Sequence, residues 1–454
     1  MNFISLKYIL FLPLAVFIYR LCPKKLRTAL LLAMSLFFYG CFGIKYLALL
    51  SFVTLLSYLC ALAIERFEAR KKLFVVIAAL GSLLPLLFFK YAGLIPGIGG
   101  IALPVGLSFY SFQALGYVID VYRGDAPEKN ILRYALFVAF FPQLGSGPIG
   151  RSRALLPQYK NPAPFSFTHI RDGITPILWG FFKKLVIADR MAAVVATVYS
   201  APTKFAPVEI GFATVLFAIQ IYCDFSAYTD IARGSAKLFG IDLALNFDAP
   251  YLASSVRDFW RRWHISLTSW FRDYLYFPLG GSRKGKWRTR ANTLAVFAVS
   301  GLWHGSSLTY LIWGLLNGLY LVVLPGKKEK KSPISRLLGI ALTFVLVTVA
   351  WVFFRAESLY DSLYILKQMA SFPLNMSFSP AALGIGRFDL VLFALSTMIL
   401  TAADVGFHSY GLEAAIGRRV FIRYGVWFFL LCSTLLLGAY GAGFTSQVFL
   451  YFNF

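Results

Sequence analysis

Near its middle the chain reads Arg257-Asp-Phe-Trp-Arg-Arg-Trp-His264-Ile-Ser-Leu-Thr-Ser-Trp270-Phe-Arg-Asp-Tyr274. At 100° per residue, a helix over 259–277 gathers its large apolar residues on one stripe and its arginines on the other side. The stripe consists of Trp260, Trp263, Leu267, Trp270, Tyr274 and Phe277, and the opposite side holds Arg261, Arg262, Arg272 and Asp273. A basic face opposed to an aromatic face is typical of a helix lying in the headgroup region of a membrane. His264 falls on the border between the two faces.

Two interpretations of this segment stay open. In the first, the segment is an interfacial anchor and its histidine is incidental. In the second, the arginines bind a phosphate-bearing donor at the cytoplasmic surface, because clustered guanidinium groups suit phosphate. His264 would then have a chemical role beside that donor.

A second histidine follows in Gly301-Leu-Trp-His304-Gly305, inside the uncharged apolar run 291–326. It lies about 20 Å along a helix from the start of the run, which predicts a position near the bilayer midplane. Burial favours the neutral imidazole, the form that a general base needs to take a proton from a hydroxyl group. Gly301 and Gly305 would leave room for a substrate or a neighbouring helix. The alternative is a structural histidine that is hydrogen-bonded between helices.

The composition places these segments in a membrane protein. Hydrophobic residues make up 59% of the chain and charged residues 14%, against about half and about a quarter in soluble proteins. A spanning helix needs about 17–25 apolar residues, and several apolar stretches are long enough. These stretches are 8–19, 28–44, 46–64, 73–89, 134–150, 291–326, 337–354, 390–403 and 426–448. The fold class predicted is an all-α polytopic membrane protein.

The net charge of +24 is divided among short loops between the apolar stretches, such as 24–27, 66–72, 283–290, 327–331 and 418–419. That distribution indicates cytoplasmic anchoring under the positive-inside rule rather than binding to nucleic acid. The first and third loops are basic and the second, around Gly43, is not. This alternation predicts an extracytoplasmic N-terminus.

We expect a single integral-membrane domain over 1–454, with N-terminal scaffold spans (1–104), a core (105–326) and C-terminal spans (327–454). Between residues 173 and 276 charged residues such as Lys183, Lys184 and Asp189 interrupt the apolar stretches. Charges at membrane depth normally face protein or water, so the site is expected in this region. Here Asp224 and Asp230 are either buried partners for arginine or histidine, or Asp224 orients a catalytic imidazole.

Other chemistries find no support in the sequence. The five cysteines have neither metal-ligand nor CxxC spacing, and His169 and His408 look isolated, so no metal site is expected. Gly145-Ser-Gly-Pro-Ile-Gly150 has the GxGxxG pattern, but it follows a helix-like apolar segment and contains Pro148, so we interpret it as a backbone break. There is no GxSxG nucleophile motif, and no histidine has an aspartate five residues later.

Several longer motifs make the chain resemble the membrane-bound O-acyltransferase (MBOAT) family, in its bacterial alginate O-acetylase group. They are 107–113, 117–124, 140–143 with 147–148, 179–189, 222–226, 246–251, 259–267, 271–276, 278–281, 301–305 and the ending Tyr451-Phe-Asn-Phe454. The resemblance runs nearly from end to end. It implies one bundle of about eleven transmembrane helices, with re-entrant and interfacial helices.

By the same resemblance, His304 matches the catalytic histidine of the family and His264 its second motif histidine. Residues beside them become candidates for support or donor binding: Asp224, Trp260, Arg261, Arg262, Trp263 and Trp303. No cofactor is expected to stay bound, and the donor substrate would be acetyl-CoA or another acetyl thioester.

The function expected is therefore transfer of acetyl groups across the bacterial inner membrane for O-acetylation of an extracytoplasmic polysaccharide. The polymer could be an alginate-like exopolysaccharide, cellulose or peptidoglycan, and a periplasmic serine-dependent acetyltransferase would be the partner that completes the transfer. One alternative is D-alanyl transfer from a carrier protein to teichoic acid. Another is a non-catalytic transporter, for which replacing either histidine would leave the cargo chemically unchanged.

Overall fold

The computed structural model describes residues 1–95, 102–164, 166–324, 332–371, 378–410, 416–440 and 449–450. The basic loop 327–331 and the terminal motif 451–454 lie outside the described residues. Within these ranges the regular secondary structure is helical throughout, which confirms the all-α prediction. Among the described residues, six helices are long and apolar enough to cross a membrane: α3 (Ile44–Arg66), α4 (Lys71–Tyr91, within the apolar segment Glu68–Leu94), α11 (Pro207–Leu238), α16 (Pro333–Arg355), α18 (Arg387–Tyr410) and α20 (Val420–Leu437). The chain is thus polytopic, and the number eleven stays a prediction.

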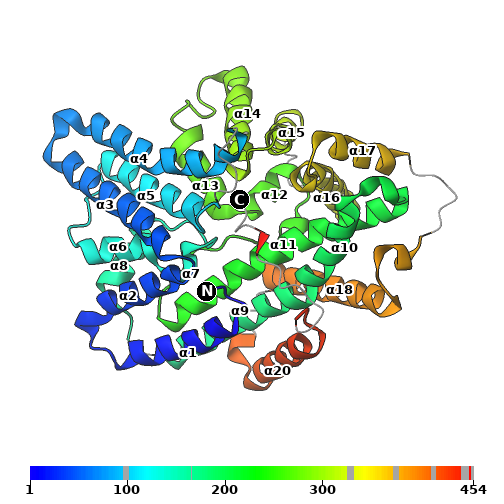
Figure 1. Cartoon of the computed structure of the whole chain (residues 1–454), viewed down its shortest axis with the longest axis horizontal. Coiled ribbons are helices and arrows are strands. Elements are labelled where there is room, and N and C mark those ends of the chain that lie inside the picture. The colour runs from blue at the N-terminus through cyan, green and yellow to red at the C-terminus, as the bar shows by residue number, and fades with distance from the viewer. Residues whose placement is uncertain are drawn as a thin grey trace. The chain divides into compact units, whose positions relative to one another are not determined.

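The described chain forms two compact units, one made of Met1–Gly180, Tyr228–Leu245 and Val448–Phe454, and the other of Phe181–Ala227 and Asn246–Gln447. Besides α3 and α4, the helices of the first unit are α1 (Leu6–Leu21), α2 (Arg27–Gly40), α5 (Leu107–Tyr122), α6 (Ile131–Ala139), α7 (Phe141–Leu144), α8 (Ser152–Lys160) and most of α9 (Phe167–Phe182). In this unit α3, α4 and α5 pack against one another and α2 packs against α6 (Figure 1). The expectation of a single domain stays a prediction.

In the first unit the Gly145–Gly150 segment is a tight turn after α7. A Cβ atom on Gly147 would lie 2.4 Å from the Cα of Gln143, so the backbone itself occupies the space beside this glycine. Gln113 of α5 stabilises the turn, because its side-chain oxygen accepts a hydrogen bond from the N–H of Gly150 at 2.8 Å. The structure is consistent with a backbone break here and gives the motif 107–113 a packing role.

The second unit contains both motif histidines. Its helices, besides part of α11 and the spans α16, α18 and α20, are α10 (Asp189–Ser200), α12 (Val256–Arg262), α13 (Ile265–Phe271), α14 (Gly285–His304), α15 (Leu308–Val323) and α17 (Leu359–Ala370). A π-helical segment, Lys183–Ala188, precedes α10, and a second one, Arg272–Tyr276, follows α13.

Residues 291–323 of the apolar run fold as a helical hairpin, with α14 and α15 side by side (Figure 1). His304 is the last residue of α14, and the chain turns through Gly305 to Ser307, whose hydroxyl accepts the N–H of Thr309 at the start of α15. The histidine is therefore at the end of a helix at the tip of a hairpin, and not within a continuous span.

Glycines allow the two helices of the hairpin to touch. A Cβ atom on Gly301 would lie 2.3 Å from the carbonyl oxygen of Tyr310, and one on Gly314 would lie 2.2 Å from that of Phe297. Of the two roles considered for Gly301, a neighbouring helix and not a substrate occupies the space beside it. The same close approach fixes the position of His304, three residues later.

We expect Gly301→Ala to push α14 and α15 apart and to lower the melting temperature of the detergent-solubilised protein, because overpacking typically costs about 1–3 kcal/mol. Gly211→Ala is the matched control: a Cβ there meets no atom within 4 Å, so helix propensity predicts a gain of up to about 1 kcal/mol. Melting temperatures that shift equally in both variants would contradict this account of the hairpin.

Candidate active site

His304 is enclosed by aromatic rings. Its imidazole is buried, with ring centroids 4.9 Å from Trp313 of α15, 5.4 Å from Phe354 of α16 and 4.8 Å from the adjacent Trp303. Trp313 in turn stacks on Trp351 at 5.7 Å. Such walls exclude water, and in a site without water a hydrogen bond or a charge on a reacting group has a larger effect than in solvent.

His264 lies between α12 and α13, where the sequence predicted one continuous helix. That prediction is wrong: α12 ends at Arg262, Trp263 is extended, and His264 has a φ of 45° in the left-handed region. This conformation is uncommon for residues other than glycine, and local contacts normally stabilise it. The aromatic stripe does not face a membrane surface: five of its six residues, Trp260, Trp263, Leu267, Trp270 and Tyr274, are buried in the protein.

The segment that follows α11 stabilises the break between α12 and α13. The backbone oxygen of Asn246 accepts the N–H of Ile265 at 3.0 Å, and its side-chain oxygen accepts the N–H of Ser266 at 3.1 Å. The N–H of Asp248 is donated to the carbonyl oxygen of Arg262 at 3.0 Å. These bonds use backbone groups that helix termini otherwise leave without partners.

Trp303 brings the two motif histidines together. Its ring centroid lies 6.3 Å from that of His264 and 4.8 Å from that of His304. His264 also contacts Phe225 of α11 edge to face, with the two ring centroids 4.7 Å apart. The two imidazoles and the indole thus form one cluster within the second unit, although Trp303 is 39 residues after His264 in the chain.

Two tryptophans, Trp260 within α12 and Trp263 directly after it, pack around this cluster. Trp260 donates its indole N–H to Asn317 at 3.3 Å and meets Trp313 edge to face at 5.9 Å, so Trp313 separates it from His304. Trp263 packs among Phe247, Tyr251, Phe259 and Trp351. Both residues shape the site, and Trp260 also borders a pocket.

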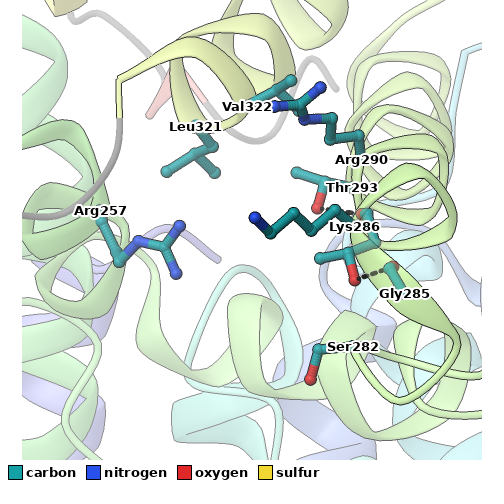
Figure 2. Close-up of a pocket in the computed structure, with 9 residues that line it drawn as sticks. Arg257, Ser282, Gly285, Lys286, Arg290, Thr293, Leu321 and Val322 are labelled. Atoms are coloured by element: carbon teal, nitrogen blue, oxygen red, sulfur yellow. Dashed lines mark hydrogen bonds between the residues drawn. The ribbon is translucent and has the colours of Figure 1, made fainter.

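Two pockets adjoin this region. The first, which we call the basic pocket, has a volume of about 330 Å³ and is lined by Arg257, Lys286 and Arg290 together with Ser282, Thr289 and Thr293. Figure 2 shows the side chains of Arg257 and Lys286 pointing toward one another across it. No acidic residue is among the described residues that line it. Facing cations without a carboxylate between them favour an anionic ligand.

The second, which we call the aromatic pocket, has a volume of about 280 Å³ and shares Arg257, Thr293 and Leu321 with the basic pocket. Its other lining residues are Trp260, Arg261, Thr268, Arg272, Tyr276, Val296 and Phe297. Trp260 therefore has one side toward this pocket and contacts Trp313, the ring beside His304. Arg261 borders the pocket, as a donor-binding residue would.

Arg262 does not line either pocket. It pairs with Asp258 at 3.0 Å and lies 3.0 Å from Nε2 of His408, whose Nδ1 is 2.8 Å from Asp248. Because a guanidinium group only donates, Nε2 accepts and Nδ1 donates to the carboxylate. In the sequence His408 looked isolated from possible metal ligands, and in the fold its neighbours are a guanidinium group and a single carboxylate. Its partners are distant in sequence, so no local pattern could reveal them.

Asp224 pairs with a lysine. Nζ of Lys184 lies 2.6 Å from Asp224 and 2.8 Å from Asp189, and all three side chains are buried. The neighbouring Lys183 donates to Ser226 at 2.7 Å. Asp224 is thus a buried partner of a cation, as one of the two interpretations held, although the cation is neither arginine nor histidine. The next residue of α11, Phe225, contacts the imidazole of His264.

Burial sets the protonation of His264 and gives folding a pH dependence. It lowers the pKa of this imidazole from 6.5 to about 3. Below pH 6.5 the unfolded chain binds a proton that the folded protein does not take up until about pH 3, so stability falls as the pH falls through this window. By about pH 5 the loss is about 2 kcal/mol.

We expect the melting temperature of the solubilised protein to fall less between about pH 7.5 and about pH 5 in His264→Gln than in the wild type, because glutamine does not titrate. Each variant is compared with itself at the higher pH, so a general loss of stability from the substitution cancels. Equal falls in the two proteins would show that His264 is not the group that titrates.

Sequence comparison identifies the class of protein. Residues 31–325 match the model of the MBOAT, membrane-bound O-acyltransferase family. The chain is 36% identical over 408 residues to the probable alginate O-acetylase AlgI of Pseudomonas fluorescens, which covers 88% of this chain and 80% of that protein. The chain belongs to the membrane-bound O-acyltransferase family, as its motifs suggested. It is a multi-pass membrane enzyme that transfers acyl groups to oxygen.

Two further relatives differ in the names they carry. The peptidoglycan O-acetyltransferase of Helicobacter pylori is 34% identical over 379 residues, with 74% of this chain and 72% of that protein aligned. The teichoic acid D-alanyltransferase of Streptococcus thermophilus is 28% identical over 267 residues, with 56% of this chain and 64% of that protein aligned. Similarity is thus greater, and extends further, toward the two acetylating relatives.

Proposed function

We propose that this enzyme takes acetyl from a cytoplasmic thioester and passes it across the bacterial inner membrane for O-acetylation of an extracytoplasmic polysaccharide. The observation that carries the proposal is the cluster of His264, Trp303 and His304. The aromatic pocket lies near this cluster, because Trp260 lines the pocket and contacts Trp313, the ring beside His304. The names of the alginate and peptidoglycan acetylating relatives support acetyl as the group transferred.

The hairpin suggests how donor and acceptor approach from opposite sides. α14 begins with Lys286, Arg288 and Arg290, residues that the positive-inside rule assigns to the cytoplasm. From Ala291 to His304 the helix rises about 20 Å, which is deep in a hydrocarbon layer of about 30 Å. A donor bound at the start of α14 and a hydroxyl entering at its end would meet at His304. The same rule gives the N-terminus an extracytoplasmic position.

In this chemistry His304 is the general base. It takes the proton of the acceptor hydroxyl as that oxygen attacks the thioester carbonyl carbon. The new C–O bond forms, the C–S bond breaks, and the sulfur leaves with the electron pair of that bond. The proton then passes from the imidazole to the sulfur, so the donor departs as a thiol and His304 is neutral again. His264 would position the donor or exchange protons beside Trp303.

The two pockets divide the donor between them. The basic pocket suits the phosphate groups of acetyl-CoA, or of another phosphate-bearing acetyl thioester. The aromatic pocket, in which Arg261 and Arg272 lie beside apolar side chains, suits the adjoining arm of the donor. In this arrangement the acetyl end points toward Trp260 and the cluster beyond it. No cofactor stays bound, because the donor is consumed as a substrate.

Removing one cation from the basic pocket is expected to weaken donor binding. We expect Lys286→Ala to raise KM for acetyl-CoA roughly tenfold to a hundredfold with little change in kcat, since a hydrogen bond to a charged group contributes about 1.5–3 kcal/mol. Arg288→Ala is the matched control, because it removes a cation from the same helix that does not line either pocket. Equal effects in the two variants would mean that the basic pocket does not bind the donor.

The acceptor is tested in the host. A strain without this chain, and the same strain with the chain restored, are compared by mass spectrometry of ester-linked groups on exopolysaccharide, peptidoglycan and teichoic acid. Acetyl esters that disappear and return on one polymer would support the proposal and identify the polymer. D-alanyl esters that behave in this way would favour the alternative reaction. A periplasmic serine-dependent acetyltransferase is the partner proposed for the final transfer, and its deletion should cause the same loss.

A further inference from the structure

Asn246 lies against the imidazole of His264 and is completely buried. Its side-chain oxygen accepts the backbone N–H of Ser266 at 3.1 Å and is 3.4 Å from Nδ1 of His264. Its backbone oxygen accepts the N–H of Ile265. One residue thus contacts the left-handed histidine and the first two residues of α13, from a segment that is 18 residues earlier in the chain.

These contacts determine which nitrogen of His264 carries the hydrogen. A backbone N–H only donates, so the atom of Asn246 that faces Ser266 is the amide oxygen and not the amide nitrogen. That oxygen only accepts, so Nδ1 of His264 must be the donor to it. A neutral imidazole has one N–H group, and at neutral pH this imidazole is uncharged. The lone pair is therefore on Nε2.

The other end of the same amide has no protein acceptor. Nδ2 of Asn246 is buried, and none of the residues in the described part of the chain accepts a hydrogen bond from it. Leaving a buried donor without a partner costs about 1–3 kcal/mol, so a water molecule, an ion or a bound ligand is needed to satisfy it. Because Nδ2 and the side-chain oxygen belong to one planar amide, this donor is within a few ångströms of the imidazole.

We propose that Asn246 contributes to acyl transfer through both ends of its amide. Its oxygen holds His264 with the hydrogen on Nδ1, which leaves Nε2 to accept the hydrogen of a substrate thiol or hydroxyl. Its Nδ2 donates a hydrogen bond to the acyl oxygen of the thioester, where negative charge develops during attack. Donors placed in this way typically contribute a factor of about 10²–10³ in kcat. This inference rests on the proposed acyl transfer and adds the group that binds the acyl oxygen.

Two substitutions separate the two roles. Asn246→Asp keeps oxygens for Ser266 and Nδ1 but removes the donor, so the tautomer should persist while kcat falls about 10²–10³-fold with little change in KM. Asn246→Leu removes both ends, so the Nδ1-protonated form should also be lost. The tautomer is observed directly by ¹⁵N NMR of histidine-labelled protein, with the His264→Gln spectrum identifying the signal.

Asn292→Asp is the structural control. Asn292 is also buried, but its Nδ2 donates to the carbonyl oxygens of Leu279 and Gly281, so its replacement should lower stability without changing the His264 signal. Full kcat in Asn246→Asp would exclude binding of the acyl oxygen by Nδ2. A wild-type spectrum with the hydrogen on Nε2 would exclude the positioning role. A wild-type protein that transfers no acetyl would instead contradict the proposed function, and the spectrum would still report the tautomer.

Discussion

Replacing His304 with alanine is expected to lower acetyl transfer by a factor of about 10²–10⁴, the usual contribution of a general base. The residue has this effect because the acceptor hydroxyl must lose its proton as it attacks, and the aromatic walls around His304 keep out the water that could otherwise accept it. The measurement is the amount of O-acetyl ester on the host polysaccharide, divided by the amount of this protein in the membrane.

His169→Ala is the matched control, because it removes a histidine that belongs to the first unit and lies in neither the cluster nor the pockets. It is expected to acetylate as the wild type does. Full acetylation by His304→Ala at normal abundance would remove His304 from the chemistry. A structural or transport role would then explain the site better.

The largest effect on stability is expected from Lys184→Met. Its ammonium group lies between Asp224 and Asp189, so methionine would leave two buried carboxylates without their cation. Removing one partner of a buried ion pair typically costs about 3–5 kcal/mol. We therefore expect a large fall in the melting temperature of the solubilised protein, and a lower yield in the membrane.

Two controls show whether charge is the cause. The triple variant Lys184→Met, Asp189→Asn, Asp224→Asn removes all three charges of this ion cluster and should recover much of the lost stability. Lys204→Met removes a lysine from an exposed position in the same unit and should melt close to the wild type. If Lys184→Met melts like Lys204→Met, the buried cluster does not stabilise the fold.

The sequence predicted the class of fold because a membrane leaves few solutions. Long apolar stretches must form helices in lipid, since backbone groups find no partners there, and α3, α4 and α16 agree with the stretches that predicted them. The hairpin was less accessible. The run 291–326 is apolar throughout, and only Gly305-Ser-Ser307 marks the turn that makes His304 the end of α14.

Other features depend on contacts that no local pattern contains. The 3.6-residue periodicity continues through His264, so it predicted one helix, whereas bonds from Asn246 and to Asp248 hold that residue in a left-handed conformation. The lysine beside Asp224 is 40 residues away in the chain. A charged residue in an apolar setting does predict that some partner exists, but it does not identify that partner.

The chemistry proposed does not need a cysteine or serine nucleophile. A thioester already carries an activated acyl group, so orientation of the reactants and stabilisation of the developing oxyanion supply much of the rate. Trp303 orients two imidazoles, Asn246 is proposed to bind the acyl oxygen, and the hairpin glycines keep His304 in place.

In the proposed reaction, acetyl enters from the cytoplasmic face and leaves on the other. The most direct test of this route uses sealed inside-out membrane vesicles from cells that make this chain, its proposed partner and the polysaccharide. With [¹³C]acetyl-CoA supplied outside, mass spectrometry should find ¹³C-acetyl esters on the enclosed polymer, and none with His304→Ala. Sealed right-side-out vesicles should incorporate label only after permeabilisation. Label that enters the polymer equally well in the His304→Ala vesicles, or in sealed right-side-out vesicles, would contradict the account.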